Sequence, residues 1–155
     1  MPAPQIAQLN VARLAMPYDD PRMQPFIEQL EPVNASAEQH PGFVWRLESD
    51  QVHDPELAAF EASGWLVNMS VWQSIEALKG FICSPGHLAV MRRRGEWFTP
   101  WPEATMVLWW VLPGHKPDFA EALEKLERLR SDGPSAEAFS FSDAFDPPVE
   151  LAGAA

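Results

Sequence analysis

The sequence predicts an α+β domain of the ferredoxin-like type, with a four-stranded antiparallel sheet and helices on one face. Short apolar stretches and amphipathic helical stretches follow one another in the order β-α-β-β-α-α-β-α. Pro, Gly or Asp residues separate most of these stretches. The two β-x-β halves of this order place the strands in the spatial order four, one, three, two.

The strands are expected where apolar or alternating residues run between turn residues. They cover Ile6 to Leu14, Phe43 to Glu48, Trp65 to Trp72, and Thr105 to Leu112. Strands three and four are apolar or aromatic on both parities, so the second face of the sheet has to be covered. A sister sheet is the simplest cover, which predicts a symmetric homodimer, a dimeric α/β barrel.

The helices are expected at stretches with helical spacing and capping residues. The first begins at Asp19-Asp20-Pro21, where Asp caps free N–H groups, and Pro32 is expected to kink or end it. Asp50 to Ser63 predicts a loop with at most one helical turn. The remaining helices are expected from Ser74 to the break at Ser84-Pro85-Gly86, from His87 to Phe98, and from Phe119 to Leu129. Residues 1–140 then form the domain and residues 141–155 an acidic, Pro-containing tail.

Composition excludes several classes of partner. Lys and Arg total 11 against 22 Asp and Glu, a formal charge of −11, which argues against nucleic acid or an anionic membrane. Cys83 is the one cysteine, so neither an intramolecular disulfide nor a cysteine metal cluster can form. The most apolar run, Met106 to Leu112, is too short to cross a bilayer. With no leader pattern at the N-terminus, a cytoplasmic location is expected.

Four polar side chains on the predicted central strands form the most informative set. Side chains two positions apart share a face, so Gln8 with Asn10 and Asn68 with Ser70 form two polar pairs on neighbouring strands. One interpretation is a ligand-binding cluster, with Asn10 and Asn68 as donors to an oxyanion and Gln8 and Ser70 as ligand contacts. The other is a structural network across the strands or a dimer interface.

The other candidates are single residues. His87, at a predicted helix start, is a possible general base or a capping residue. Arg92 is a possible carboxylate ligand or part of a solvated helix face. Trp72, Trp97 and Trp110 are possible walls of an aromatic pocket or ordinary core and interface residues. The histidines show no metal-ligand spacing, so no metal site is expected.

Four segments carry a resemblance to a known family: I-A-Q-L-N-V-A-R-L, V-N-M-S-V-W-Q-S-I-E-A-L-K-G-F, M-R-R-R-G-E-W-F and V-L-W-W-V. Over Ile6 to Phe141 the chain resembles a bacterial family classified as a domain of unknown function. That family belongs to the dimeric α/β-barrel superfamily, which includes antibiotic-biosynthesis monooxygenases, haem-degrading monooxygenases, muconolactone isomerases and chlorite dismutases. The resemblance implies the fold and a homodimer.

The resemblance also implies an activity: a small-molecule enzyme like the cofactor-independent monooxygenases or isomerases, acting on a small hydrophobic or aromatic molecule. Of the residues typical of the haem-degrading branch, Asn10 matches, whereas Phe81 and Met91 stand where that branch has a Trp and a His ligand. We therefore expect no cofactor, with haem as the less favoured case. The alternative function is a non-catalytic binding or regulatory module for a hydrophobic ligand or haem.

Overall fold

The structure, a computed structural model, describes residues 3–154. Its centre is an antiparallel sheet of β1 (Gln5–Leu14), β2 (Phe43–Arg46), β3 (Trp65–Trp72), β4 (Phe98–Thr99) and β5 (Met106–Val111). The main strands run in the order β2-β3-β1-β5, and the short β4 pairs with the end of β1. Because β5 is the fourth strand of the prediction, both the ferredoxin-like fold class and the strand order are confirmed.

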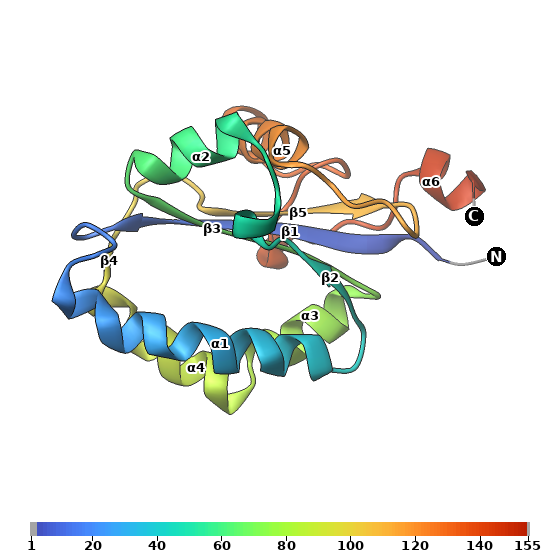
Figure 1. Cartoon of the computed structure of the whole chain (residues 1–155). Helices are drawn as coiled ribbons and strands as arrows, with labels where there is room; N and C mark the ends of the chain where they lie inside the picture. Colours follow the sequence, from blue (N-terminus) through green and yellow to red (C-terminus); the bar gives the residue numbers. More distant parts are fainter. Residues whose placement is uncertain (1–2, 155) are drawn as a thin grey trace.

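Helices cover both faces of the sheet (Figure 1). The helices α1 (Gln24–Gln39), α3 (Ile75–Ile82) and α4 (Pro85–Arg92) lie on one face, as predicted for the connections between strands. The helices α2 (Pro55–Ala62) and α5 (Phe119–Asp132) lie on the opposite face. We call these faces the α1 face and the α5 face.

The α5 face is buried by this chain alone. It carries the odd-numbered residues of the central strands, and α5 packs Ala122, Leu126 and Leu129 onto them. Leu9, Met69 and Val107 are completely buried there. The cover that the sequence analysis assigned to a sister sheet is thus supplied by α2 and α5.

Two helical predictions are wrong. Asp50 to Ser63 was expected to be mostly loop, but it contains the eight-residue helix α2. Asp54 caps that helix by accepting from the N–H groups of Glu56 and Leu57, and Leu57 is buried. The local cap and the burial of Leu57 outweigh the weak periodicity of the segment.

The second error concerns the helix expected from His87 to Phe98. Instead, α4 ends at Arg92, a short 3₁₀ turn covers Arg94–Glu96, and Phe98 begins β4. Trp97 is 1% exposed and its ring lies 5.3 Å from that of Phe26, so burial of the indole fixes the chain path here. The first helix does not end at Pro32: α1 continues through that residue to Gln39, which excludes the ending but not the kink among the two predicted outcomes.

A bulge in β2 changes which face its residues occupy. Phe43 pairs with Trp72 but Trp45 pairs with Val71, so Val44 is the extra residue between them. Phe43 therefore lies on the α1 face and Trp45 on the α5 face. Arg46 follows opposite Ser70, back on the α1 face.

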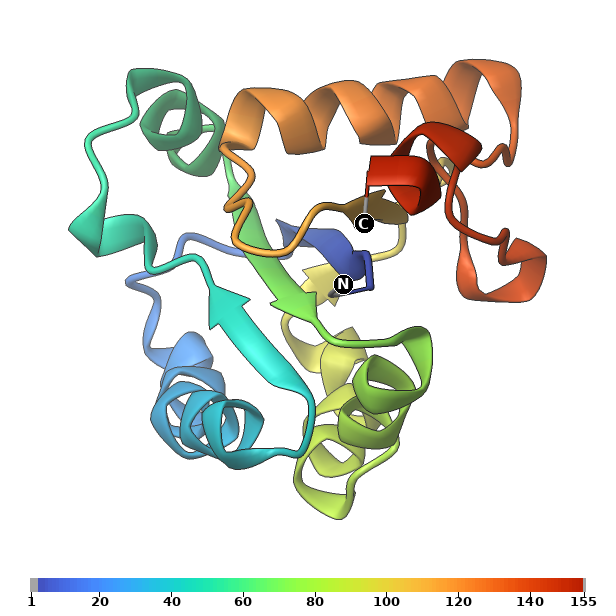
Figure 2. The same ribbon diagram turned by 90° about the vertical axis from the view of Figure 1, so that its right-hand side faces the viewer.

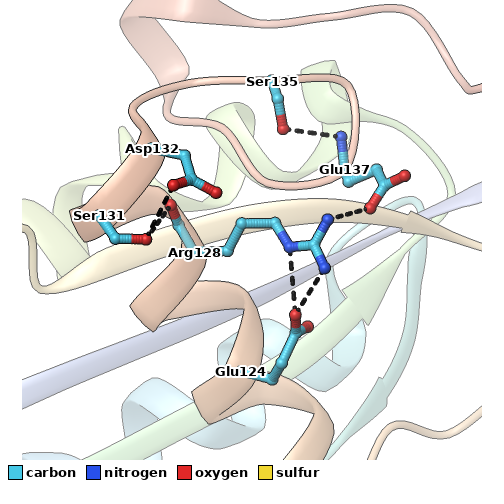
Figure 3. A network of polar contacts seen from close by, with 6 residues as sticks. All are labelled: Glu124, Arg128, Ser131, Asp132, Ser135 and Glu137. Carbon is cyan, nitrogen blue, oxygen red and sulfur yellow. Dashed lines mark hydrogen bonds and ion pairs between the residues drawn. The ribbon is translucent and has the colours of Figure 1, made fainter.

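The segment after α5 returns to the sheet edge (Figure 2). Arg128 bonds Glu124 on α5 and Glu137 in the following turn, which ties the turn to the helix (Figure 3). Phe139 then forms an antiparallel bridge with Leu108 of β5 and is completely buried. The chain continues through a 3₁₀ turn at Phe141–Asp143 and ends in α6 (Val149–Ala154).

Candidate functional site

The four predicted polar residues lie together on the α1 face. In the register of β1 and β3, Gln8 is opposite Ser70 and Asn10 is opposite Asn68. Gln8 Nε2 donates hydrogen bonds to Asn68 Oδ1 at 2.7 Å and to Ser70 Oγ at 2.8 Å. We call Gln8, Asn10, Asn68 and Ser70 the polar strip.

The hydrogen bonds of the strip fix the direction of the Ser70 hydroxyl. Ser70 Oγ also accepts from Trp72 Nε1 at 2.9 Å, so both of its acceptor positions are filled. Its own proton is therefore available as a donor. Among residues 3–154 this proton has no acceptor, and Gln8 Oε1, Asn68 Nδ2 and the Asn10 amide have no partner either.

Burial differs along the strip. Gln8 is 3% exposed and Ser70 7%, whereas Asn10 is half-buried and Asn68 is exposed. Asn68 is therefore the strip residue that meets solvent most directly. A molecule entering from solvent would reach Asn68 before the buried Ser70.

Two separate apolar clusters flank the strip on the α1 face. One contains Ile6, Trp72 and Leu108 of the sheet, with Phe81 of α3 packed on Trp72. The other contains Met23, Phe26 and Trp97, with Leu14 and Leu66 of the sheet packed against them. Trp72 and Trp97 thus belong to apolar clusters on the same face as the polar strip.

Arg46 is a charged neighbour of the strip that no sequence pattern marked. The β2 bulge places it directly opposite Ser70, so Arg46, Ser70 and Gln8 lie in one row across three strands. Its guanidinium binds Glu38 of α1 and Glu48. Strict alternation along β2 predicts that Arg46 and Phe43 lie on different faces of the sheet. No sequence signal marks the bulge that brings them to the same face.

His87 lies apart from the strip. His87 Nδ1 is 3.0 Å from the Ile82 carbonyl oxygen, which can only accept, so in the neutral ring Nδ1 holds the proton and Nε2 has the free lone pair. Burial lowers the pKa of His87, and the hydrogen bond to Ile82 opposes this only in part. Its ring contacts Phe81, which stacks on Trp72.

His40 also packs against this aromatic group. Its ring meets Trp72 at 5.8 Å and Phe81 at 6.0 Å, both edge-on. No sequence pattern singled out His40. The contact was not readable from the sequence because it depends on the fit of the turn after α1 against α3.

The remaining predicted residues occupy different places. Arg92 is exposed at the end of α4. Trp97 is in the core beneath the guanidinium of Arg93, which lies 4.8 Å from the ring centroid. Trp110 donates to the Phe145 carbonyl oxygen at 2.9 Å, at the edge where the C-terminal segment docks. The structure therefore gathers the four strip residues and Trp72, but neither Arg92 nor Trp110 bonds to them.

Two surface hollows lie outside the strip. One of about 200 Å³ is lined by Ser49, His53, Leu57 and Glu61, among others, and burial raises the pKa of Glu61 there. The other, of about 380 Å³, lies between Pro102 and Arg130. Within residues 3–154 no helix has the length and hydropathy to cross a membrane. His, Cys, Asp and Glu side chains of this described part form no group of three suited to a metal ion.

Solved structures with a similar arrangement include three that match most of the chain. SnoaB of Streptomyces nogalater, a cofactor-independent oxygenase, has 17% identity, a TM-score of 0.47, and coverage of 75% of this chain and 100% of its own. PA3566 of Pseudomonas aeruginosa has 12% identity, a TM-score of 0.48, and coverage of 72% and 95%. Rv0793 of Mycobacterium tuberculosis has 15% identity, a TM-score of 0.48, and coverage of 74% and 99%.

Sequence comparison identifies the family directly. No curated protein matches the chain. A family described as a domain of unknown function, DUF3291, matches residues 5–154, from the first strand to the C-terminal helix. The match covers nearly the whole sequence and agrees with the resemblance carried by the strand and helix segments. The chain belongs to the DUF3291 family.

Proposed function

We propose that the chain binds a small planar organic molecule over the polar strip and acts on it as an enzyme of the cofactor-independent monooxygenase or isomerase type. The observation that supports this is the orientation of Ser70, whose acceptor positions are filled by Gln8 and Trp72. Its hydroxyl is thereby preorganised as a donor. Asn68, two positions along the same face of β3, adds a second donor group. Two such donors suit an oxygen that gains negative charge.

The proposed reaction begins with removal of a proton next to a carbonyl group. Ser70 and Asn68 would stabilise the resulting enolate oxygen, while Gln8 holds both donors in position. Return of the proton to another carbon is an isomerisation, and reaction of the enolate with dioxygen is an oxygenation. Asn10 would contact the same ligand from β1.

His87 is the proposed base. Its lowered pKa keeps the imidazole neutral near pH 7, and its Nε2 lone pair is free to take a proton. Trp72 and Trp97, from the clusters on either side of the strip, are the proposed walls for a flat ligand, which would have to displace the side chains that cover them, since each is 1% exposed. Arg92 and Trp110 remain proposals without a contact to the strip.

The second candidate is a binding or regulatory module without catalysis, for a hydrophobic ligand or haem. It is favoured by the chemistry of the strip, which consists of amides and one hydroxyl. His87 connects to it only through the rings of Phe81 and Trp72. A Soret band in the visible spectrum of the purified protein would identify bound haem.

Deuterium exchange at the carbon next to the ketone of α-tetralone tests the enzyme proposal. We expect the protein to accelerate this exchange, and Ser70→Ala and Asn68→Ala each to reduce the rate by about 10²-fold, as for the loss of one oxyanion donor. The exposed Ser36→Ala on α1 is the control and should leave the rate unchanged. Binding of α-tetralone without exchange supports the binding module. Absence of both contradicts a ligand site at the strip.

We also propose that the chain forms a homodimer. Since α2 and α5 already cover the second face of the sheet, the contact would use another surface, and the outer edge of β2 is one without a strand partner among the described residues. Sedimentation at micromolar concentration should give twice the chain mass. A mass near 17.4 kDa would contradict the dimer.

A further inference from the structure

Arg46 is close to the polar strip although it comes from the edge strand. It pairs with Ser70 across β2 and β3, so both side chains point to the α1 face. The Cβ atoms of directly opposed residues lie about 4.5–5.5 Å apart. The Arg46 side chain therefore leaves the sheet one strand spacing from Ser70, on the side away from Gln8.

Hydrogen bonds hold the guanidinium of Arg46 in place but occupy only some of its N–H donors. Arg46 Nε donates to Glu38 Oε1 at 3.2 Å and Nη2 donates to Glu48 Oε1 at 3.1 Å. A guanidinium has five N–H donors, and Nη1 has no partner among residues 3–154. The Arg46 side chain is 21% exposed, so it is neither free in solvent nor closed off.

A ligand carboxylate would compete with Glu38 and Glu48 for the charge of Arg46, and both of these carboxylates are partly exposed. The side chains of Glu38 and Glu48 are 45% and 54% exposed, so water and salt screen their charges. Their hydrogen bonds instead fix the plane of the guanidinium, which lowers the entropic cost of binding another acceptor.

The donors around Ser70 outnumber the acceptors. Arg46, Ser70 and Asn68 each present N–H or O–H groups without a partner in the described chain. Gln8 Oε1 is the matching acceptor on the other side of Ser70. A row of donors with one positive charge at its end is complementary to an oxygen-rich anion.

We propose that the ligand of the polar strip carries a carboxylate, and that Arg46 is the specificity-determining residue that binds it. This inference rests on the proposed function, because it needs a ligand over the strip. Arg46 binds the carboxylate at the outer end of the strip, while Ser70 and Asn68 contact the oxygen of the reacting group.

Calorimetric titration with two matched probes tests the proposal: α-tetralone and its carboxylate derivative. We expect the full chain to bind the carboxylate more tightly than the ketone. Arg46→Gln should weaken carboxylate binding by about tenfold and leave ketone binding within about twofold. Arg46→Lys should keep part of the preference, because it keeps the charge without the planar fork. Arg22→Gln removes another Arg–carboxylate pair, away from the strip, and is the control.

A purely structural role of Arg46 makes different predictions. If Arg46 only ties α1 to β2, then Glu38→Gln, which removes its partner on α1, should weaken both probes alike, whereas the proposal expects this change to strengthen binding of the carboxylate. Equal loss of both probes in Arg46→Gln, or no loss of the carboxylate, overturns the inference. In that case the proposed function stands if ketone binding still responds to Ser70→Ala. Failure of both probes to bind the unmodified chain overturns both proposals.

Discussion

Gln8 and Ser70 are direct partners across β1 and β3, and Gln8 Nε2 lies 2.8 Å from Ser70 Oγ. Both side chains are almost completely buried, so water cannot readily replace the bond if one partner is lost. The pair therefore serves the stability of the sheet as well as the proposed site. The two contributions can be separated by measurement.

Replacing Gln8 by Met removes the donor while preserving side-chain length. We expect Gln8→Met to lower the free energy of unfolding by about 1–3 kcal/mol, because buried polar groups lose a partner. In the double variant with Ser70→Ala, the loss of unfolding free energy should be smaller than the sum of the two single losses. Urea unfolding of the unmodified chain, the two single variants and the double variant measures this coupling. Strictly additive losses would show that the bond contributes nothing to stability.

Gly42 and Gly114 form a matched pair for testing the contact between the turn after α1 and α3. Both have positive φ, +89° and +87°, so Ala is strained at either position. A Cβ on Gly42 would overlap the Cβ of Ala77, whereas one on Gly114 meets open space. Gly42→Ala should therefore lower the melting temperature more than Gly114→Ala. Equal losses would mean that the turn does not pack tightly on α3.

The C-terminal residues before and after Phe145 should differ in how much they contribute to stability. Truncation after Phe145 is expected to leave the melting temperature nearly unchanged, since Val149 is 83% exposed and the truncated chain keeps the Phe145 carbonyl that binds Trp110. Phe139→Ala should instead cost about 3–5 kcal/mol, because Phe139 is completely buried. Thermal unfolding compares the two. A drop of several degrees on truncation would contradict the first expectation.

His87 should make stability depend on pH. Burial lowers its pKa in the folded chain, so as the pH falls below the usual value of about 6.5 the unfolded chain takes up the proton first. The stability due to neutral His87 is thus present above that pH and lost below it. We expect His87→Gln to lose less unfolding free energy than the unmodified chain between about pH 7 and pH 5. Identical losses in urea titrations at both pH values would contradict this.

The fold was predictable because its signals are local and mutually consistent. Alternating apolar residues in β1 and β3 and the Pro-Gly breaks fixed the strands, and their order fixed the topology. The helix α2 was missed because its amphipathic pattern is weak, although Asp54-Pro55 is a capping signal of the kind recognised at Asp20-Pro21. The docking of Phe139 was not predictable because the apolar stretch around it, Ala138 to Phe141, is too short to show a periodicity.

The polar strip was predictable for a simple reason. Polar residues two apart on one strand share a face, so pairs on neighbouring strands meet once the strand order and a compatible register are given. The observed register places Asn10 opposite Asn68. Contacts that depend on helix placement were not predictable. His40 and His87 reach the same Phe81 ring from different elements, and no spacing in the sequence relates them.

The bulge at Val44 determines which side chain of β2 faces the polar strip. One additional residue in β2 brings Arg46 to the face of Ser70, while Trp45 turns to the opposite core. A regular β2 that kept Val44 would instead pair Val44 with Val71 and Trp45 with Ser70, which would turn Arg46 to the α5 face. Among relatives of this chain, the pairing of β2 with β3 therefore decides whether an arginine at this position faces the polar strip.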